Sequence, residues 1–289
     1  VIFLKTGNVL SNESVFTVNN IEVNKNSFKN KEELIEISFK KVFKKLNSKI
    51  LLEDDFNKLR GTNLRTIKNL ISHYQITNNK DSSKNSILIN LFFKRDKMYN
   101  FYSRNNISYS DVGGKNIEIL PILTIDDEIF IYDNNFFYSE WLNDENNFDK
   151  VNKSIEYTLL LENIEVIEKI KQNEFNLEKI NLNQLFDQSS DKDILLILVN
   201  YRKNKAKVFL KGNISSKQIV KNLIISDPNK NKLEYQNILF FLKKEILEIV
   251  KSQNIINIGT PSFLNVRLNL EKRKDLFIFQ NILNELDLI

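Results

Sequence analysis

Acidic side chains are the residues of this sequence best suited to catalysis, because cysteine is absent and histidine occurs once. Asp126, Asp127, Glu140 and Asp144 fall within one short stretch. Two carboxyl groups roughly 5 to 10 Å apart across a cleft can act as general acid and base on a glycosidic bond. The alternative function that we carry forward is therefore a hydrolase with carboxylate general acid/base chemistry. A hairpin tip is the commoner explanation for Asp126 and Asp127, since aspartate in turns bonds its own backbone.

Residue types exclude most other catalytic and cofactor chemistry. Without cysteine there are no disulfides, thiolate metal ligands or cysteine nucleophiles. The single histidine, His73, leaves almost no freedom to build a catalytic triad or a multi-histidine zinc site. Its position near the end of a predicted helix is explained by the helix dipole. The six glycines lack the spacing of a phosphate-binding turn. We expect no cofactor and no metal, and we assign no catalytic residue.

A dense aromatic segment, NNFFYSEW at 134–141, carries the sole tryptophan. A single helical turn of this composition ordinarily packs on a sheet as part of the core. The alternative is an exposed protein-binding patch made of Phe136, Phe137 and Trp141. Full burial of these side chains would exclude that patch.

The net charge of +5 and the isoelectric point near 9.0 suggest a nucleic-acid partner. The distribution of charge argues against one, because basic residues are spread among 37 acidic ones. The densest basic runs, at 40–45 and 271–275, fall on predicted helix or turn surfaces. The abundance of Asn, Lys and Ile beside a single alanine, Ala206, is typical of an AT-rich genome. We expect no specific nucleic-acid binding.

Membrane insertion and export are separate questions. The longest apolar run, at 194–199, is far shorter than the roughly 20 residues of a spanning helix, so we expect no membrane span. The segment VIFL at 1–4 precedes a polar stretch. It is either the tail of a signal-peptide apolar region or an ordinary short strand.

Hydrophobic periodicity predicts an α/β (α+β) fold in three parts. Residues 1–112 form a small N-terminal domain of sheet and helices. Its predicted elements are a strand at 15–23, a helix opened by Asn30 and Glu33 at capping-box spacing, a short helical turn from Glu53, a helix from Thr62 with Leu64, Ile67, Ile71 and Tyr74 on one side, a strand at 86–93 and a helix from Asp96 to about Asn105.

Residues 113–230 form a middle α/β domain that begins at the paired glycines Gly113 and Gly114. It has predicted strands at 117–125, 128–132, 155–162, 193–201 and 205–212, helices at 164–170 and 177–185, and an ambiguous segment at 214–226 that favours a strand. This alternation implies parallel pairings covered by helices. Residues 231–289 form a long helix opened by Asn231 and Glu234, followed by a partial unit of a strand at 264–270 and a helix capped by Asp275.

Several of these segments, taken in order, resemble the proteobacterial proteins grouped as domain of unknown function 2066. They are VNNIEV, LRTIKNLISHYQITN, SILINLFF, NNISYSD, IEILPIL and NNFFYSEW. In that family an ILPIL-like segment precedes an acidic turn and a motif Asn-Pro-Trp-x-x-Ala-Trp. Asn135 and Trp141 match this motif, whereas Phe136, Phe137 and Glu140 replace the proline, the first tryptophan and the alanine. The middle region also resembles the N-terminal domain of the translocation protein TolB.

The resemblance implies an exported protein of the periplasm or cell envelope, with a signal peptide truncated at Val1. It also implies action through contacts with another envelope protein, and it supplies no catalytic residue. The first hypothesis is therefore a non-enzymatic protein that binds a partner through an exposed sheet edge or through the aromatic segment. A cytoplasmic location is the alternative to the periplasm, and the oligomeric state is open.

Overall fold

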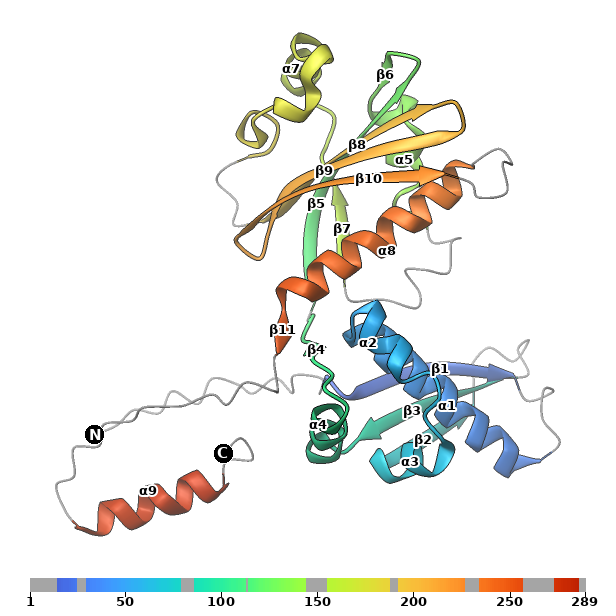
Figure 1. Cartoon of the computed structure of the whole chain (residues 1–289), viewed down its shortest axis with the longest axis vertical. Helices are drawn as coiled ribbons and strands as arrows, with labels where there is room; N and C mark the ends of the chain where they lie inside the picture. Colours follow the sequence, from blue (N-terminus) through green and yellow to red (C-terminus); the bar gives the residue numbers. More distant parts are fainter. Residues whose placement is uncertain are drawn as a thin grey trace. The chain divides into compact units, whose positions relative to one another are not determined.

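The computed structural model describes residues 15–24, 30–78, 86–112, 114–143, 155–187, 192–226, 234–256 and 273–285 (Figure 1). The chain divides into two units, residues 1–258 and residues 259–289. The described part of the second unit is the helix α9 (Arg273–Glu285). The first unit contains two larger sheets and their helices, which we call the first lobe (15–112) and the second lobe (114–253). The mixture of helices and sheets confirms the predicted α/β class.

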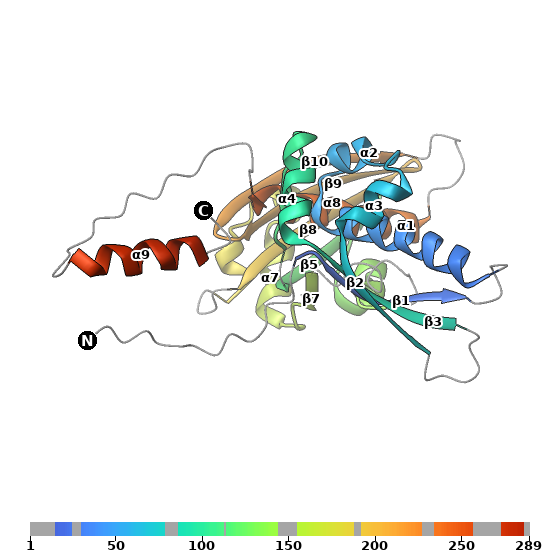
Figure 2. The ribbon, with the colours of Figure 1, turned by 90° about the horizontal axis from the view of Figure 1, so that it is seen from below.

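The first lobe is a three-stranded antiparallel sheet covered by helices. Its elements are β1 (Thr17–Asn24), α1 (Lys31–Ile50), α2 (Glu53–Lys58), α3 (Leu64–Leu70), β2 (Ile71–Asn78), β3 (Ser86–Phe93) and α4 (Arg95–Arg104). The strand order is β1-β3-β2. The chain order of strand, helix, two strands and helix is that of a β-α-β-β-α-β unit without its last long strand. Helices α1 to α3 lie on one side of this sheet (Figure 2).

Helix α1 forms where the sequence predicts it, because a local cap and an apolar stripe agree. The Asn30 side chain accepts a hydrogen bond from the backbone N–H of Glu33 at 2.8 Å, which satisfies one of the free donors of the first turn. Val42 and Leu46 on the stripe are fully buried against the sheet, in one core with Ile89 of β3. Burial of this stripe, more than helix propensity, holds the helix in place.

The predicted helix from Thr62 ends earlier than its periodicity suggests. Asn63 caps α3, which stops at Leu70, and the following residues form the edge strand β2. The prediction that His73 lies near a helix end is therefore wrong. In the structure His73 pairs with Phe92 of β3, and its ring stacks on the phenyl ring with centroids 4.2 Å apart. Pairing with the apolar strand β3 has overridden the helical spacing of Ile67, Ile71 and Tyr74.

The second lobe is built around a mixed sheet. Its elements are β5 (Lys115–Ile125), β6 (Glu128–Phe130), η2 (Tyr132–Asn134), α5 (Phe136–Glu140), β7 (Ile155–Leu159), α7 (Ile164–Gln172), η3 (Glu174–Lys179), η4 (Leu182–Gln184), β8 (Asp193–Arg202), β9 (Lys205–Ile214), β10 (Lys217–Ser226) and α8 (Tyr235–Gln253). The strand order is β10-β9-β8-β5-β6, with β7 also on β5. Strand β5 runs parallel to β7 and β8, which confirms the predicted parallel pairings.

Each face of this sheet buries its own core. On one face, α8 and α5 cover residues such as Ile119, Leu195 and Leu210. On the other face, α7, η3 and η4 cover Leu120, Leu196 and their neighbours. Because α8 completes the first of these cores, the chain does not divide at residue 230, where the sequence predicted a domain boundary. The short strand β4 (Tyr109–Ser110), near the end of the first lobe, pairs with β11 (Ile255–Ile256), which follows α8. The two form a separate two-stranded sheet.

Two further predictions concern the end of the chain. The predicted strand at 264–270 and the capping residue Asn231 lie outside the described residues. Helix α8 begins at Tyr235 with Glu234 as its N-cap residue. Helix α9 begins at Arg273, so Asp275 lies in its first turn instead of capping it.

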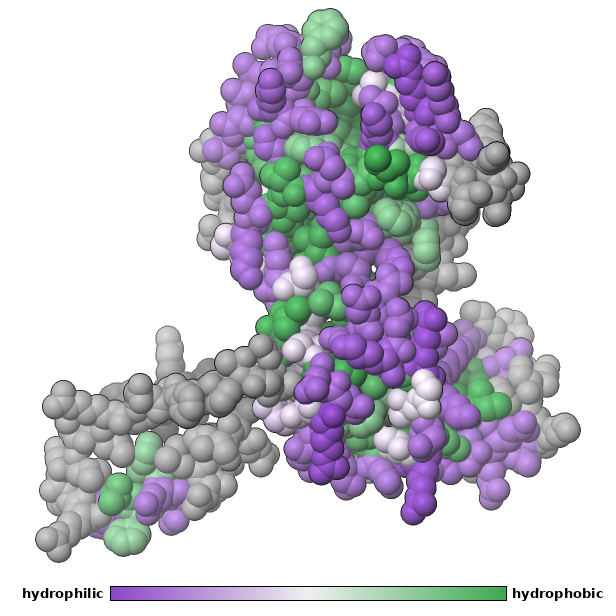
Figure 3. Space-filling model, in the orientation of Figure 1, coloured by the Kyte–Doolittle hydropathy of each residue, from purple (hydrophilic) through white to green (hydrophobic). Residues whose placement is uncertain are grey.

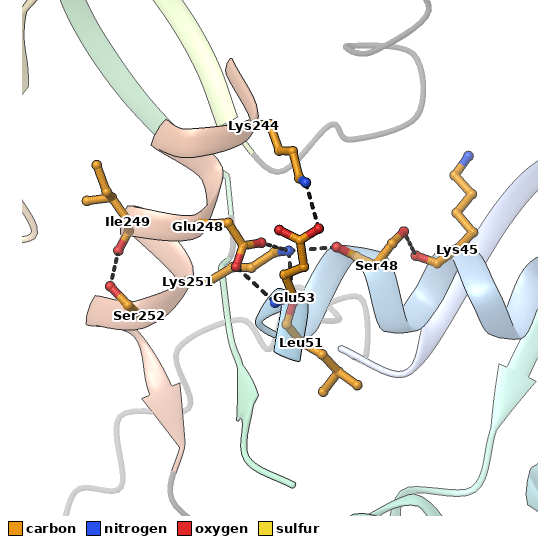
Figure 4. A network of polar contacts seen from close by, with 9 residues as sticks. All are labelled: Lys45, Ser48, Leu51, Glu53, Lys244, Glu248, Ile249, Lys251 and Ser252. Carbon is orange, nitrogen blue, oxygen red and sulfur yellow. Dashed lines mark hydrogen bonds and ion pairs between the residues drawn. The ribbon is translucent and has the colours of Figure 1, made fainter. Parts of the chain in front are cut away.

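A polar cluster on α8 contacts the end of α1 and the start of α2 (Figure 4). Lys251, 3% exposed, donates hydrogen bonds to the carbonyl oxygens of Ser48 and Leu51 and to the Glu248 carboxylate. Glu248 also accepts from the backbone N–H of Glu53 at 3.0 Å, and Lys244 pairs with the Glu53 carboxylate at 2.7 Å. Side chains of the second lobe therefore satisfy helix-end groups of the first.

Candidate protein-binding edge

The aromatic segment is part of the core and does not form the expected patch. Phe137 and Trp141 are fully buried, and Phe136 is half-buried against the same core. The Trp141 ring meets Tyr157 of β7 edge-on, with centroids 5.6 Å apart. The Asn135 side chain caps α5 and also donates to the Pro121 carbonyl, which fixes this turn on β5. An accessible protein-binding patch of Phe136, Phe137 and Trp141 is therefore excluded.

Of the candidate carboxylates that the structure describes, Asp126 and Asp127 are exposed and Glu140 is half-buried. Asp126 and Asp127 occupy the left-handed turn between β5 and β6, with φ of 45° and 71°. The Asp126 side chain is 79% exposed and lies 4.0 Å from that of Arg202. The Glu140 carboxylate accepts a hydrogen bond from the Asn143 amide at 3.0 Å, and Asp144 lies outside the described residues. Asp126 and Asp127 therefore form a hairpin tip and do not face each other across a cleft.

The part of the chain that the structure describes contains no cluster of metal-binding side chains. There, no three His, Asp or Glu side chains lie close enough together to hold a metal ion. Among these same residues, no helix is both long and apolar enough to cross a membrane. Exposed surfaces of the described residues offer another kind of site.

The most conspicuous of these surfaces is the outer edge of β10. Strand β10 is the last strand on its side of the second-lobe sheet, and no described strand pairs with its free edge. It is ten residues long, regular, and without proline. Natural proteins usually shorten, charge or cover such an edge, because its unpaired backbone groups can bind another strand. An edge of this length that no described strand covers is therefore a candidate binding site.

The turn before β10 determines which backbone groups point outward. Ser215 and Ser216, with φ of 51° and 60°, form a two-residue turn between β9 and β10. Such a turn makes its flanking pair, Ile214 and Lys217, a hydrogen-bonded pair, and the pattern then alternates along the ladder. The N–H and C=O groups of Val220 and Ile224 therefore point away from β9, toward the free edge.

The same residues carry exposed apolar side chains. Val220 is 59% exposed and Ile224 is 72% exposed. The alternate side chains of β10 point to α8, where Ile219 and Ile225 are buried and Lys221 pairs with Glu245 at 2.7 Å. Figure 3 shows hydrophobic atoms exposed among hydrophilic ones over the part of the surface formed by this lobe. The free edge thus presents main-chain hydrogen-bonding groups together with apolar contact area.

Basic residues border the exposed side chains of Val220 and Ile224. In the β9–β10 register, Lys207 lies opposite Ile224 and Lys211 lies opposite Val220. Lys205 and Lys207 are exposed, and neither forms an ion pair among the described residues. Arg202 of β8 pairs with Lys205 in the ladder and extends the basic row. We call Val220, Ile224 and the free backbone of β10 the edge site, and Arg202, Lys205, Lys207 and Lys211 the basic row.

A polar pocket of about 410 Å³ lies at one end of the edge site. Its lining residues come from η3, η4, β9 and β10: Lys179, Asn181, Leu182, Asn183, Lys211, Asn213 and Gln218. Gln218 stands two residues before Val220, so both side chains lie on the same face of β10. Of the candidate carboxylates, Asp126, Asp127 and Glu140 do not line this pocket.

Sequence reasoning named a sheet edge as one possible binding surface but could not say which strand forms it. The segment 214–226 was ambiguous, and the outward position of Val220 and Ile224 depends on the register with β9. A local signal did exist in KAKVFLK at 205–211, where lysines alternate with apolar residues. That spacing predicts one basic and one buried face for the strand.

Comparison with known proteins adds no function. No family model matches the chain, and no curated protein matches it. A solved structure described as "Crystal structure of uncharacterized protein" covers 50% of this chain and 90% of its own, at 10% sequence identity and a TM-score of 0.21. A likeness at that score supports no inference about fold or function.

Proposed function

We propose that this chain is a non-enzymatic binding protein whose edge site takes an extended segment of a partner protein as an added strand. One observation carries the proposal: Val220 and Ile224, whose backbone groups point outward from β10, also carry exposed apolar side chains. In strand addition, main-chain hydrogen bonds supply affinity and alternate side chains supply specificity. Val220 and Ile224 provide both contributions on one face.

The polar contacts of β10 favour a preformed edge. Lys217 donates to the Gln253 carbonyl and Lys221 pairs with Glu245, so two side chains tie the strand to α8. The full ten-residue pairing with β9 fixes it on the other side. A rigid edge loses little conformational entropy on binding, which improves affinity for a given contact area.

The test uses a phage-displayed library of random 12-residue peptides, selected on the whole chain. Enriched peptides are synthesised, and hydrogen exchange with and without each peptide is followed along the chain. We expect protection of residues 217–226 and loss of binding in Ile224→Lys, because a charge at this position opposes an added strand. Ile164→Lys is the matched control, since Ile164 on α7 is 73% exposed against 72% for Ile224.

A second variant tests the hydrogen bonds themselves. Val220→Pro removes an outward N–H and leaves the β9 ladder donors in place, so the chain should fold and bind peptides weakly. The proposal is overturned if no peptide protects 217–226, or if Ile224→Lys binds the selected peptides as well as Ile164→Lys does.

We also propose that this binding takes place in the cell envelope, and the sequence resemblance is the support for that location. Expression of the complete gene from its native start, followed by fractionation and mass measurement of the mature N-terminus, tests it. A cleaved periplasmic product would support the location. An uncleaved cytosolic product would overturn the location and leave the edge site untouched.

A further inference from the structure

We infer that the partner segment is acidic and that it places a carboxylate in the pocket beside Gln218. This inference rests on the strand addition proposed above and names the chemistry of the segment. It follows from the charge and the donor groups of the surface around β10, which are separate from the free backbone that supports strand addition itself.

The pocket is rich in hydrogen-bond donors, and no acidic residue of the described ranges lines it. Lys211 donates to the carbonyl oxygens of Glu178 and Ile180 at 3.1 and 2.7 Å. An ammonium group has three N–H donors, so one donor of Lys211 remains for a ligand. Lys179 is exposed and has no ion-pair partner among the described residues. A carboxylate, which only accepts hydrogen bonds, complements this set.

The amides of the pocket add further donors around the two lysines. The Asn181 side-chain oxygen already accepts from the backbone N–H of Asn183 at 3.1 Å, which leaves its NH₂ group to donate. Asn183, Asn213 and Gln218 are exposed and line the same pocket. These groups can orient a carboxylate that the lysines attract.

The basic row extends the preference for acidic side chains along β10. Lys207 lies opposite Ile224 and Lys205 lies opposite Ser226, so cations flank the edge site away from the pocket. A strand added to β10 would lie two strand spacings, roughly 10 Å, from β9. Long lysine and glutamate side chains can meet over that distance, because lysine extends its charged end beyond an apolar stem.

The positions on β10 translate into a pattern for the partner. Side chains facing Gln218, Val220 and Ile224 lie on one face, at successive steps of two and then four positions. A parallel partner would therefore show an acidic residue, an apolar residue two positions later and another apolar residue four positions after that. An antiparallel partner would show the reverse order.

A peptide fits this surface better than other anions do. Single-stranded nucleic acids gain affinity by stacking bases on exposed aromatic rings. On this face of β9 and β10 the one aromatic residue, Phe209, is 9% exposed. The apolar side chains of Val220 and Ile224 and the outward backbone groups of β10 would contribute nothing to the binding of a polyphosphate. They complement an extended chain that carries an acidic side chain and two apolar ones on the same face.

The experiment starts from synthetic peptides that protect residues 217–226 in the whole chain. Each acidic residue is replaced in turn by its amide, Glu by Gln and Asp by Asn, and dissociation constants are measured at low and high salt. We expect one replacement to weaken binding about two- to fivefold at low salt, the effect of an exposed ion pair. Added salt should reduce this difference by screening.

Protein variants then locate the contact. Lys179→Gln should weaken the binding of the acidic peptide and leave the binding of the amide peptide unchanged. Such non-additivity is expected when two residues interact directly. Lys40→Gln is the matched control, because it removes the same charge from an exposed position on α1. Lys207→Gln tests the basic row in the same way.

The outcomes separate this inference from the proposed function. If peptides protect 217–226 but bind equally well as amides, the acidic preference is wrong and strand addition stands. If no peptide protects this strand, strand addition fails and the acidic preference fails with it. If poly(U) RNA or phosphatidylglycerol vesicles protect the strand and displace the peptides, the partner is not an acidic peptide.

Discussion

The Lys251 ammonium lies 2.9 Å from the carbonyl oxygen of Leu51, a residue 200 positions earlier in the chain. Leu51 is the C-cap residue of α1, and the Ser48 carbonyl one turn before it accepts from the same lysine at 2.7 Å. Cations are favourable at a helix C-terminus, where carbonyl groups lack partners within the helix. Lys251 thus uses the end of a first-lobe helix as its binding site.

Replacement of this lysine should destabilise the protein. Lys251→Met removes three hydrogen bonds from a nearly buried site and leaves the Ser48 and Leu51 carbonyls and Glu248 without this partner. We expect a loss of about 2 to 4 kcal/mol in the free energy of unfolding, measured by urea denaturation. Lys244→Met, at the exposed ion pair with Glu53, should cost at most about 1 kcal/mol. Equal effects of the two variants would contradict the role given to Lys251.

Tyr102 should make the protein less stable at alkaline pH. Burial raises the pKa of its hydroxyl well above the ordinary value of 10.0, with a smaller contribution from Tyr109. The folded state therefore keeps a proton that the unfolded state releases above pH 10.0. The stability linked to this group is complete below that pH and is lost as the pH rises toward the raised folded-state pKa.

The variant Tyr102→Phe separates this effect from the hydrogen bond that the hydroxyl makes. The hydroxyl donates to the Asn47 side-chain oxygen at 2.7 Å, so the variant should lose about 1 to 2 kcal/mol at neutral pH. Between about pH 8 and about pH 11 it should then lose less stability than the wild type. Urea unfolding at several pH values gives both curves. Parallel curves for the two proteins would rule out a titrating Tyr102.

Much of the fold was predictable because its determinants are local. The cap at Asn30, the apolar stripe of α1 and the aspartate turn at Asp126 each depend on residues a few positions apart. The parallel pairings of β5 followed from the alternation of strands and helices. These features predict elements of both lobes from local sequence signals alone.

The rest depends on pairings between distant residues, which spacing does not encode. The helical spacing that ends in Tyr74 was overridden when His73 and its neighbours paired with β3. The edge site has the same origin, since Val220 and Ile224 are exposed only because β10 ends the sheet and because its register with β9 turns them outward. The burial of Trp141 likewise follows from its contact with β7.

Fluorescence provides a direct check on the burial of Trp141. It is the sole tryptophan, so its emission reports one site, and complete burial predicts a blue-shifted spectrum with little quenching by iodide. The variant Trp141→Phe/Leu142→Trp moves the ring by one position, to a side chain that is 51% exposed. Its emission should shift to the red and be quenched strongly. Strong quenching of the wild type would show that Trp141 is exposed, and the aromatic segment would again be a candidate binding patch.

Gly212 should be the least replaceable glycine among those that the structure describes. A Cβ at this position would collide with the backbone carbonyl oxygen of Ile194 and lie 2.9 Å from the Leu195 side chain. Both neighbours belong to the central strand β8, whose backbone cannot move without disturbing β5. We therefore expect Gly212→Ala to lose about 2 to 3 kcal/mol in urea unfolding.

Gly61→Ala is the control for this prediction, because nothing lies within 4 Å of its added Cβ. It should be neutral or should stabilise the protein by up to about 1 kcal/mol, through the smaller entropy of the unfolded chain. Strain from Gly212→Ala should also loosen the β8–β9–β10 ladder and speed hydrogen exchange over 205–226. If Gly212→Ala matches Gly61→Ala in stability, β9 does not approach β8 as closely at this position as the structure shows.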